Sequence, residues 1–530
     1  MTKVMNYFVN DWNTNQYQNL NIRTRGNTTR TALGTLTFGF CAALIIFAFW
    51  NFDQYDTSNV FVFYVDTKQT FLRTTSKKFV SFGLDTSLLR NMKELPIMDE
   101  RFINLVRHLK PAFVRVGGTA ADCLFFEKTH KTSAKLLSPV DSQDISNFTI
   151  TDADFESLYK FTIKSELRMI FDLNVLIRYP NGSWNDANAK DIILFAKGHD
   201  MDLDWQLGNE PNSFHHVFNV TITAEQLAKD YFHLRNLLNQ AGYIQSFLVG
   251  PEANHIGDLN QGESYVETFL EKDKDSIDYV TWHQYYLNGH KAQAKDFVNL
   301  STFYYLPMQI EHMSQIIDRS KKPISMWLSE TSSAYGGGAP GLSDRYIAGF
   351  LWLDKLGYSA KAGVNVVIRQ SLFGGNYAII GPDLLPNPDW WISVIYKQFV
   401  SEKVLKIIPP KTSEYIRLYA HCTPEITLVN HVPAITIYGM NLDKSFAKII
   451  IQGIFPKLDK NLKIFVYTLT SDHLTSRNIK MNGQILKLQP DGKLPSFHPI
   501  IFNLSQVINL PPLSMVFMVI HGVHTPACIS

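Results

Sequence analysis

Two acidic residues stand where apolar stretches give way to loops. Glu210 follows Trp205 and Leu207 in DWQLGNEPNSFHH, and Glu330 closes SMWLSE just before a glycine-rich run. Breaking a glycosidic bond needs one carboxyl group to protonate the leaving oxygen and a second to meet the oxocarbenium-like carbon. Either acid alone could be a surface residue in a turn. The repeated arrangement predicts a glycosidase with Glu210 and Glu330 as its catalytic pair.

Eight apolar runs of strand length recur along the chain, with amphipathic stretches between them. The runs are 79–85, 112–118, 168–175, 203–210, 246–252, 279–286, 325–330 and 364–370, and stretches such as 224–241 and 343–355 suit helices. Alternating strands and helices predict parallel strands joined by helical crossovers. Eight such units predict an α/β fold, a (β/α)8 TIM barrel over residues 79–400. Glu210 would end the fourth strand and Glu330 the seventh, at the C-terminal face where barrel enzymes carry their chemistry.

The alternation of strand-like and helix-like stretches stops after about residue 401. Strand-like runs then follow at 415–422, 434–440, 447–453, 463–469 and 515–522, separated by Asn, Asp, Gly and Pro. This pattern predicts a C-terminal antiparallel β-sandwich domain over residues 401–530. A further apolar run at 59–71 precedes the first barrel strand.

Four motifs, in order along the chain, resemble the heparanase-like endo-β-glucuronidases of glycoside hydrolase family 79. They are LGNEPNSF, TWHQYYLNG, ETSSAYGGGAP and SDRYIAGFLWLDKLG. The resemblance runs from about residue 79 to the C-terminus. It implies a barrel with an appended sandwich, which the leading strand in residues 58–78 joins. It also implies retaining chemistry on a glycosaminoglycan, with Glu210 as general acid/base and Glu330 as nucleophile.

The resemblance further implies a set of substrate-binding residues. Asn209 would meet the sugar's 2-hydroxyl, a contact that strengthens in the transition state, unless its amide only fixes the turn. Tyr285 would steer Glu330, and His283 would bind sugar or donate to a carboxylate, although a lone His is more often a satisfied core residue. The residues expected to hold a glucuronate are Asp85, Thr119, Tyr335, Gly336, Gly337, Gly375, Asn376 and Tyr377. Glycines there would let backbone amides approach the sugar's carboxylate, or would simply form a flexible loop.

No metal or cofactor signature stands out in the sequence. The four cysteines are scattered, and His215 and His216 lack the spaced partners that a metal site requires. The run 336–338 is followed by no GK[ST], so it is not a phosphate loop. Fifty basic against 48 acidic residues give a net charge of +2, which does not indicate a nucleic-acid partner. We therefore expect no metal, no cofactor and no nucleic acid.

The N-terminal region suggests a membrane segment. Residues 31–52 contain no charged side chain and approach the roughly 20 residues that span a bilayer. Three arginines precede this run and two aspartates follow it, at Arg23, Arg25, Arg30, Asp53 and Asp56. The positive-inside rule then predicts a single-pass type II membrane protein with a lumenal or extracellular catalytic domain, preceded by a disordered cytosolic tail over residues 1–30. The alternatives are a cleaved signal peptide with a secreted or lysosomal product, and a buried helix.

Four cysteines are too few for a disulfide scaffold. Cys41 lies in the apolar segment and Cys123 just past the second predicted strand, so neither has an obvious partner. The resemblance implies a disulfide between Cys422 and Cys528 that ties the sandwich to the chain end. Two free thiols are the alternative.

Two departures from the family pattern bear on the substrate. Only about 50 residues separate Gly118 from Arg168, which leaves little for excision, and the stretches 138–160 and 252–272 are neutral or acidic where vertebrate relatives carry basic clusters. Three hypotheses follow. The first is hydrolysis of heparan sulfate in the extracellular matrix or lysosome. The second is the same chemistry on hyaluronan or another glycosaminoglycan of low sulfation. The third is a catalytically silent glycan-binding protein, against which both acids argue.

Overall fold

The structure is a computed structural model of the chain. It describes residues 59–68, 71–128, 144–257, 261–428, 431–454, 462–523 and 525–529. The predicted cytosolic tail and the predicted membrane segment lie outside these residues.

The prediction of a membrane-spanning segment is corrected. No helix among the described residues is both long and apolar enough to cross a bilayer, and the run 31–52 is not among them. The prediction rested only on an uncharged stretch of suitable length. The fold class is therefore reduced to the barrel and the sandwich, and the single-pass type II location is withdrawn with the segment.

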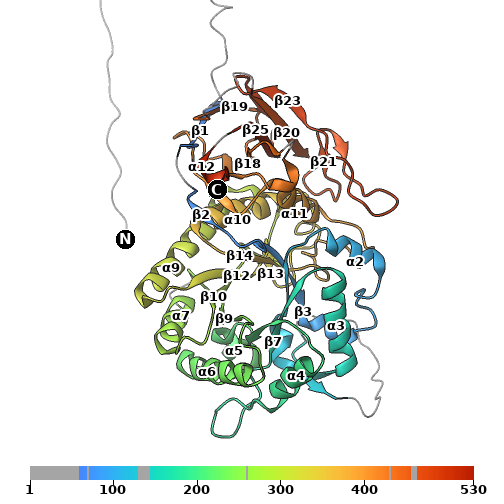
Figure 1. The fold of residues 1–530 in the computed structure, drawn as a ribbon, viewed down its shortest axis with the longest axis vertical. Coiled ribbons are helices and arrows are strands. Elements are labelled where there is room, and N and C mark those ends of the chain that lie inside the picture. The colour runs from blue at the N-terminus through green and yellow to red at the C-terminus, as the bar shows by residue number, and fades with distance from the viewer. Residues whose placement is uncertain are drawn as a thin grey trace, which may run out of the picture. The chain divides into compact units, whose positions relative to one another are not determined.

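The eight-stranded barrel is confirmed, and Figure 1 shows it in projection. Its parallel strands are β3 (Val80–Asp85), β4 (Phe113–Gly117), β7 (Arg168–Leu173), β8 (Asp204–Leu207), β9 (Leu248–Ala253), β10 (Tyr279–Gln284), β12 (Ser325–Thr331) and β14 (Val366–Arg369). The main helices that follow them are α2 (Glu100–Arg107), α3 (Asp152–Lys164), α4 (Ala187–Gly198), α6 (Ala224–Gln240), α7 (Gln261–Lys272), α9 (Tyr305–Ser320), α10 (Ala348–Ala362) and α11 (Pro388–Phe399). The strand order closes because β14 pairs with β3.

Short elements fill the connections between these strands and helices. They are η1 (Thr86–Asn91), η2 (Thr119–Cys123), β5 (Leu124–Glu127), β6 (Phe148–Thr151), η3 (Pro211–Ser213), α5 (Phe214–Phe218), β11 (Leu287–Asn288), η4 (Ala294–Val298), α8 (Leu300–Phe303) and β13 (Ala334–Tyr335). Two small parallel pairs, β5 with β6 and β11 with β13, brace them.

Inward-facing side chains divide the barrel interior into two layers. One is an apolar cluster of Phe113, Ile170, Val249, Trp327, Val366 and Ile368. Side chains two residues apart on a strand share a face, so Arg115 and Asp172 lie one step further along than Phe113 and Ile170. Both are buried. A buried charge needs a partner, and the second layer, toward the C-terminal ends of the strands, is accordingly a network of charged and polar groups.

Two sheets form the sandwich, above the barrel in Figure 1. The larger contains β2 (Arg73–Thr74), β15 (Lys403–Leu405), β17 (Ile416–Cys422), β18 (Ala434–Asn441), β25 (Ser514–His521), β20 (Lys463–Thr470), β21 (Lys480–Met481), β22 (Gln484–Ile485) and β23 (Ile500–Asn503). The smaller contains β16 (Ile407–Ile408), β1 (Val60–Val65), β19 (Ala447–Gln452) and β24 (Ile508–Leu510), and η5 (Glu425–Thr427) and α12 (Pro526–Ile529) complete the region. Strand β1 runs parallel to β19, so the sandwich differs from the purely antiparallel one expected.

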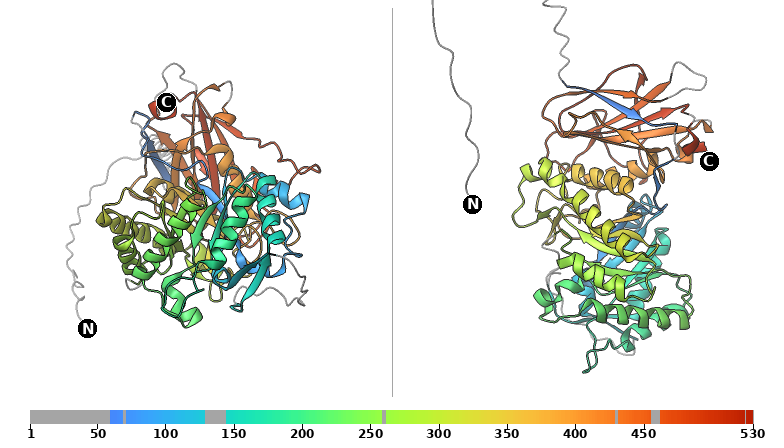
Figure 2. Two further views of the ribbon diagram at one scale, coloured as in Figure 1. Left: turned by 60° about the horizontal axis from the view of Figure 1, so that its bottom comes forward. Right: turned by 90° about the vertical axis from the view of Figure 1, so that its left-hand side faces the viewer.

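Helices α10 and α11 lie between the barrel and the larger sheet of the sandwich (Figures 1 and 2). Twelve residues of α10 are buried, as expected for a helix covered on several sides. Gly357 lets β17 approach, because a Cβ there would lie 2.1 Å from the Tyr419 ring. Arg417 and Tyr419 of β17 both donate to the buried Asp354 carboxylate, at 2.5 and 2.6 Å. The barrel and the sandwich are thus joined by packing and by charge.

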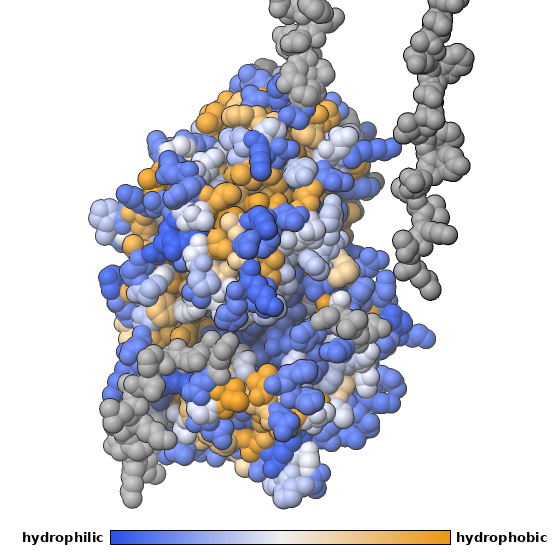
Figure 3. Space-filling view, turned by 180° about the vertical axis from the view of Figure 1, so that it is seen from behind, coloured by the Kyte–Doolittle hydropathy of each residue, from blue (hydrophilic) through white to orange (hydrophobic). Residues whose placement is uncertain are grey.

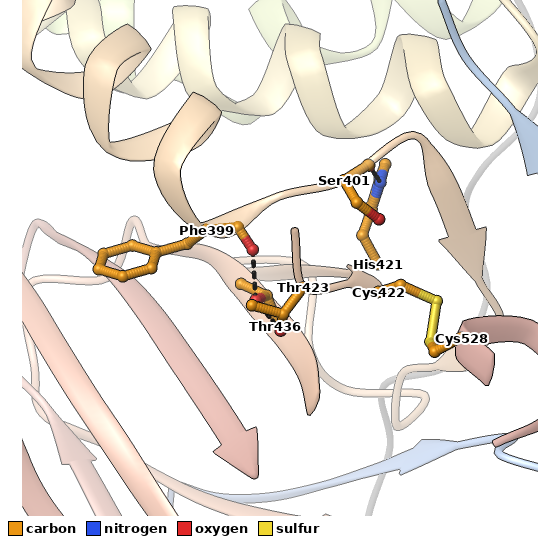
Figure 4. The surroundings of a disulfide bond; sticks show 7 residues. All are labelled: Phe399, Ser401, His421, Cys422, Thr423, Thr436 and Cys528. Carbon is orange, nitrogen blue, oxygen red and sulfur yellow. Dashed lines mark hydrogen bonds between the residues drawn. A yellow bond between two sulfur atoms is a disulfide. The ribbon is translucent and has the colours of Figure 1, made fainter. Parts of the chain in front are cut away.

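The predicted disulfide is confirmed. Cys422 at the end of β17 is bonded to Cys528 in α12, and Figure 4 shows the pair beside the threonines Thr423 and Thr436. Thr436 donates to the Phe399 carbonyl at the end of α11. Cys123 is buried with a free thiol.

Candidate active site

Glu330 lies one residue before the end of β12, opposite His283 of β10 in the strand register. Its carboxylate is largely buried and has two donors. Arg115 Nη1 donates to Glu330 Oε2 at 2.7 Å, and the Tyr285 hydroxyl donates to Glu330 Oε1 at 2.7 Å. A cation and a hydroxyl therefore fix the carboxylate at the C-terminal end of the barrel.

Glu210 reaches the same end from a tight turn. Strand β8 ends at Leu207, three residues before the predicted end. Gly208 has φ 78°, and a Cβ there would lie 2.6 Å from Val175, so only glycine fits this left-handed position. Glu210 is itself left-handed, with φ 56°, and its N–H donates to the Glu252 carbonyl at 3.1 Å. The turn, rather than the strand, directs the Glu210 side chain.

His283 joins the two acids into one cluster. One oxygen of Glu210, one of Glu330 and a ring nitrogen of His283 all lie within 4.8 Å of one another. His283 Nδ1 is 2.8 Å from Glu210 Oε1, and Nε2 is 2.8 Å from Glu252 Oε2. Burial opposes a charge on the ring, but Glu330, Glu210 and Glu252 outweigh burial and raise the pKa of His283 to about 10. The ring is then an imidazolium that donates from both nitrogens.

Arg115 is the hub of the buried polar layer. Besides Glu330, its guanidinium donates to Gln206 Oε1 at 2.9 Å and to Asn209 Oδ1 at 2.7 Å. Its Nη2 also lies 3.2 Å from Glu252 Oε2. Burial works against the charge, but the surrounding carboxylates raise the pKa of Arg115 above its ordinary value. A single cation thus orients groups from three other strands or their following turns.

The buried carboxyls divide into two groups by pKa. Burial would raise the pKa of Glu330 and of Glu252, but His283, Arg115 and hydrogen bonds to the carboxylates hold both below the ordinary value. Burial raises the pKa of Asp122 to about 7, although the backbone N–H groups of Asn209 and Val175 donate to its two oxygens. Burial and the neighbouring Asp122 raise the pKa of Asp172 well above its usual range. The site therefore keeps some carboxyls ionised and favours protonation of others.

The loops after β12 and β14 are tied to each other beside Glu330. Gly336, Gly337 and Gly338 have φ of 72°, 81° and 86°, a backbone that favours glycine. Asn376 N–H donates to the Gly337 carbonyl at 2.7 Å. A Cβ on Gly338 would lie 2.8 Å from Tyr377 N. The glycines thus let two loops meet closely.

The other predicted binding residues lie on the same side of the barrel. Asp85, at the end of β3, accepts from Gln370 Nε2 at 2.8 Å, and burial raises its pKa. Gly118 packs against the Asp85 carboxyl, since a Cβ there would lie 2.9 Å from Oδ2, and Thr119 follows at the start of η2. Tyr335 is half exposed, with its ring centroid 6.5 Å from that of Tyr285. A Cβ on Gly375 would lie 2.8 Å from the Tyr377 ring.

The surface seen from behind in Figure 3 is hollowed, and hydrophilic side chains border the hollow. A hollow of this character suits a polar ligand better than an apolar one.

Sequence reasoning missed Arg115, Glu252, Asp122, Asp172 and Gln206. A signal for three of them was present, since Arg115 interrupts AFVRVGG, Asp172 interrupts RMIFDLNV and Gln206 interrupts LDWQLGNE. A strand covered on both faces reads as a continuous apolar run. A charged or amide residue inside such a run must therefore be paired within the barrel. Their partners could not be read from the sequence, because Arg115 and Glu330 are 215 residues apart.

Two carboxyl groups side by side at the C-terminal end of a (β/α)8 barrel define a class of enzyme. The arrangement is that of glycoside hydrolases, in which a pair of acids flanks the scissile bond.

Comparison with known proteins places the chain within that class. Residues 85–357 match the family described as "Glycosyl hydrolase family 79, N-terminal domain". Heparanase of Gallus gallus is 32% identical over 510 residues, covering 86% of this chain and 94% of the relative. The chain therefore belongs to glycosyl hydrolase family 79 and is a glycoside hydrolase.

The chain is also similar to two further relatives and to one solved structure. Hyaluronoglucuronidase of Hirudo nipponia is 30% identical, covering 88% of this chain and 98% of the relative. Inactive heparanase-2 of Mus musculus is 29% identical, covering 88% of this chain and 89% of the relative. The solved structure of a 4-O-α-L-rhamnosyl-β-D-glucuronidase from Fusarium oxysporum has a TM-score of 0.64 and 14% identity, covering 86% of this chain and 99% of that one. The last shows the shared fold alone.

Proposed function

We propose that the protein is a retaining endo-β-glucuronidase that acts on glycosaminoglycans. The observation that carries the proposal is the closeness of Glu210 and Glu330, which bring one carboxylate oxygen each to within 4.8 Å. Retaining glycosidases hold their two carboxyl groups about 5–5.5 Å apart, whereas inverting enzymes leave about 6.5–9.5 Å for a water molecule. The short separation supports direct attack by one of the acids.

The surroundings of the two acids support a division of roles. Glu330 is held ionised by Arg115 and His283 and is 11% exposed, whereas Glu210 is 24% exposed. A nucleophile must stay ionised, and an acid/base must exchange protons with the leaving group and with water. These features favour Glu330 as the nucleophile and Glu210 as the acid/base.

The reaction then proceeds in two displacements. Glu330 attacks the anomeric carbon and the glycosidic C–O bond breaks, while Glu210 gives its proton to the departing oxygen. In the second step Glu210 takes a proton from water, and the resulting hydroxide oxygen replaces Glu330 at the same carbon. Arg115 and Tyr285 hold the Glu330 oxygens throughout, so the carboxylate need not reorient between the steps.

The loop joined by Gly337 and Asn376 supports recognition of an acidic sugar. Its glycines bring backbone amides close to the surface beside Glu330, and amides in a left-handed run can bind an anion. Tyr335 and Tyr377 provide ring faces next to these amides. We propose that this loop, together with Asp85, Thr119 and Gly375, binds the glucuronate whose linkage is cut.

Heparan sulfate is the first candidate substrate, because relatives that are 32% identical to this chain are named heparanase. Hyaluronan is the second. The neutral or acidic stretches 138–160 and 252–272 supply few cations for sulfate groups, and one relative is named a hyaluronoglucuronidase. A silent glycan-binding protein is the least supported, since both acids and their partners are present.

Incubating the purified protein with heparan sulfate and with hyaluronan, in parallel, and sizing the products tests the substrate. Proton NMR of the first-formed reducing end tests the stereochemistry, and the β-anomer is expected. A first-formed α-anomer would overturn the retaining mechanism. Absence of shortened chains from both polymers would overturn the endo-glucuronidase assignment.

Substitution of the two acids tests their roles. Glu330→Gln should abolish turnover while leaving polysaccharide binding nearly intact, and Glu210→Gln should slow substrates with poor leaving groups most, because these depend most on protonation. Glu263→Gln is the matched control. Glu263 is also a buried acid hydrogen-bonded to a histidine, His312, but it lies outside the cluster. Full activity of Glu330→Gln or Glu210→Gln on a natural polysaccharide would contradict the assignment.

A further inference from the structure

Lys355 is a buried lysine that the chemistry above does not use. It lies on α10 with 1% of its surface exposed. Its side-chain nitrogen donates to the Thr331 hydroxyl and, at 3.0 Å, to the Ser332 carbonyl, and it lies 4.5 Å from the centroid of the Tyr286 ring. Burial and the nearby Arg369 lower the pKa of Lys355 well below its ordinary value. Among the described residues no carboxylate forms an ion pair with it. A buried lysine is costly, so these contacts are what hold it in place.

The contacts of Lys355 continue to the ends of the neighbouring strands. Thr331 is the last residue of β12, and its hydroxyl donates to the carbonyl of Gln284, the last residue of β10. The Thr331 carbonyl accepts from Gln370 N–H, just after β14, at 2.8 Å. Glu330 and His283 come immediately before Thr331 and Gln284 in the sequence. Lys355 therefore braces the strand ends that present Glu330 and His283.

A buried cation supports the same segment. Arg369, the last residue of β14, donates to the Ser332 hydroxyl at 2.7 Å and to Asp389 of α11 at 2.7 Å. Its charge is neutralised by this carboxylate. The backbone after Glu330 is thus held from behind by two side chains, of which Lys355 alone contacts Thr331.

The residue before Lys355 faces the sandwich. Asp354 receives hydrogen bonds from Arg417 and Tyr419 of β17. Helix α10 is consequently fixed to the sandwich through Asp354 and to the end of β12 through Lys355. The sandwich gives the helix a rigid backing against which the lysine can hold the strand.

We infer that Lys355 is a positioning residue which, from behind the barrel wall, fixes the end of β12 and with it the orientation of the Glu330 carboxylate toward the substrate. The inference rests on the proposed role of Glu330 as nucleophile. Displacing a reacting group by about 1 Å can cost about 100-fold in rate. The effect of Lys355 should therefore appear in turnover rather than in substrate binding.

Lys355→Met tests the inference, because methionine has a similar length and no donor. Its kcat should fall about 10–100-fold with KM little changed. The acid limb of kcat/KM should also move to higher pH, since a displaced Glu330 loses part of the contact with Arg115 and Tyr285 that keeps it ionised. Lys322→Met is the matched control. Lys322 lies just before the start of β12, at the opposite end of the strand from Glu330, is 19% exposed and pairs with Asp273. Its replacement should therefore leave kcat and the acid limb unchanged.

The possible outcomes separate the inference from the proposed function. An inactive wild-type chain, or an active Glu330→Gln variant, overturns the proposed function and the inference with it. If those two behave as expected but Lys355→Met matches Lys322→Met, the inference alone is overturned. If circular dichroism shows that Lys355→Met does not fold, Thr331→Val decides, because it removes the hydroxyl that links Lys355 to the Gln284 carbonyl and leaves the lysine in place. A wild-type kcat in Thr331→Val overturns the inference, and a lowered kcat supports it.

Discussion

Replacing Glu252 by glutamine should change the charge state of His283. Glu252 is fully buried and accepts from His283 Nε2 at 2.8 Å, so glutamine keeps the shape and removes one negative charge. Two unit charges about 4 Å apart interact by about 4 kcal/mol at an effective dielectric constant of 20. Each pH unit corresponds to about 1.4 kcal/mol. The pKa of His283, about 10 in the wild type, should therefore fall to about 7 in Glu252→Gln.

The consequence for activity follows from the two hydrogen bonds of the ring. A neutral imidazole carries one N–H, so above its pKa His283 can donate to only one of its two neighbours. In Glu252→Gln the basic limb of kcat/KM should then begin near neutral pH, about three pH units below the limit that His283 sets in the wild type. Activity below about pH 6 should change much less, because the ring is charged in both proteins.

The assay is an NMR titration of histidine ring signals, with His283 assigned by its absence in His283→Gln. The matched control is Glu263→Gln, which removes a buried carboxylate from another histidine, His312, and should leave His283 unaffected. A pKa of His283 that stays above about 9 in Glu252→Gln would refute the electrostatic reasoning, because Glu252 would then contribute less than about 1.4 kcal/mol.

Two further predictions concern stability. The pKa of His283 is raised from 6.5 to about 10. The stabilisation that His283 gives to the fold is therefore complete below pH 6.5 and is lost as the pH rises through 10. The pKa values of Glu252 and Glu330 are lowered from 4.5. The stabilisation that these two carboxylates give to the fold is therefore present above pH 4.5 and is lost as the pH falls. The pKa of Asp122 is raised from 3.8 to about 7. Ionisation of this buried carboxyl therefore destabilises the fold as the pH rises through this range. Thermal unfolding should therefore show the highest Tm between about pH 4.5 and 6.5, and a Tm at pH 8 equal to that at pH 5.5 would contradict this. Replacing Cys422 and Cys528 by serine should destabilise the sandwich by about 5 kcal/mol, because the bond closes a loop across a separation of 106 residues; an unchanged urea midpoint would show that the bond contributes nothing.

Much of the barrel was predictable because each of its strands is an apolar run of the right length. Strands β7 and β10 begin at Arg168 and Tyr279, where the sequence predicts. The start of α10 was predicted at residue 343 but lies at Ala348. The reason is that Ser343 is buried in a turn, hydrogen-bonded to Ser333 and to the Ala339 N–H. Such tertiary hydrogen bonds do not appear in a helical pattern.

The prediction of a membrane segment failed for a different reason. Its prediction used composition and length alone, with no pattern of contacts to test it. In the described chain no helix fits the prediction.

The functional residues that lie in local sequence motifs were predictable. The properties that depend on residues distant in the sequence were not. The acids and the glycine run stand out as motifs, but the conformation of Glu210 depends on Gly208 and on a hydrogen bond to Glu252. The charge on His283 depends on acids from three other strands or the turns that follow them. The local sequence therefore identifies the titratable side chains of the site, and the closed barrel determines which of them are ionised.

The pairing of β1 with β19 has a consequence for how the protein is made. Val60 pairs with Lys448, so the entire barrel is translated between the two strands. Ribosomes add about 5–20 residues per second, so about 390 intervening residues delay the pairing by roughly 20–80 s. During that time the run VFVFYV lacks its partners from the small sheet, and an unpaired apolar strand is prone to associate with other chains. The nascent chain therefore has to keep β1 soluble until the barrel and part of the sandwich have been translated.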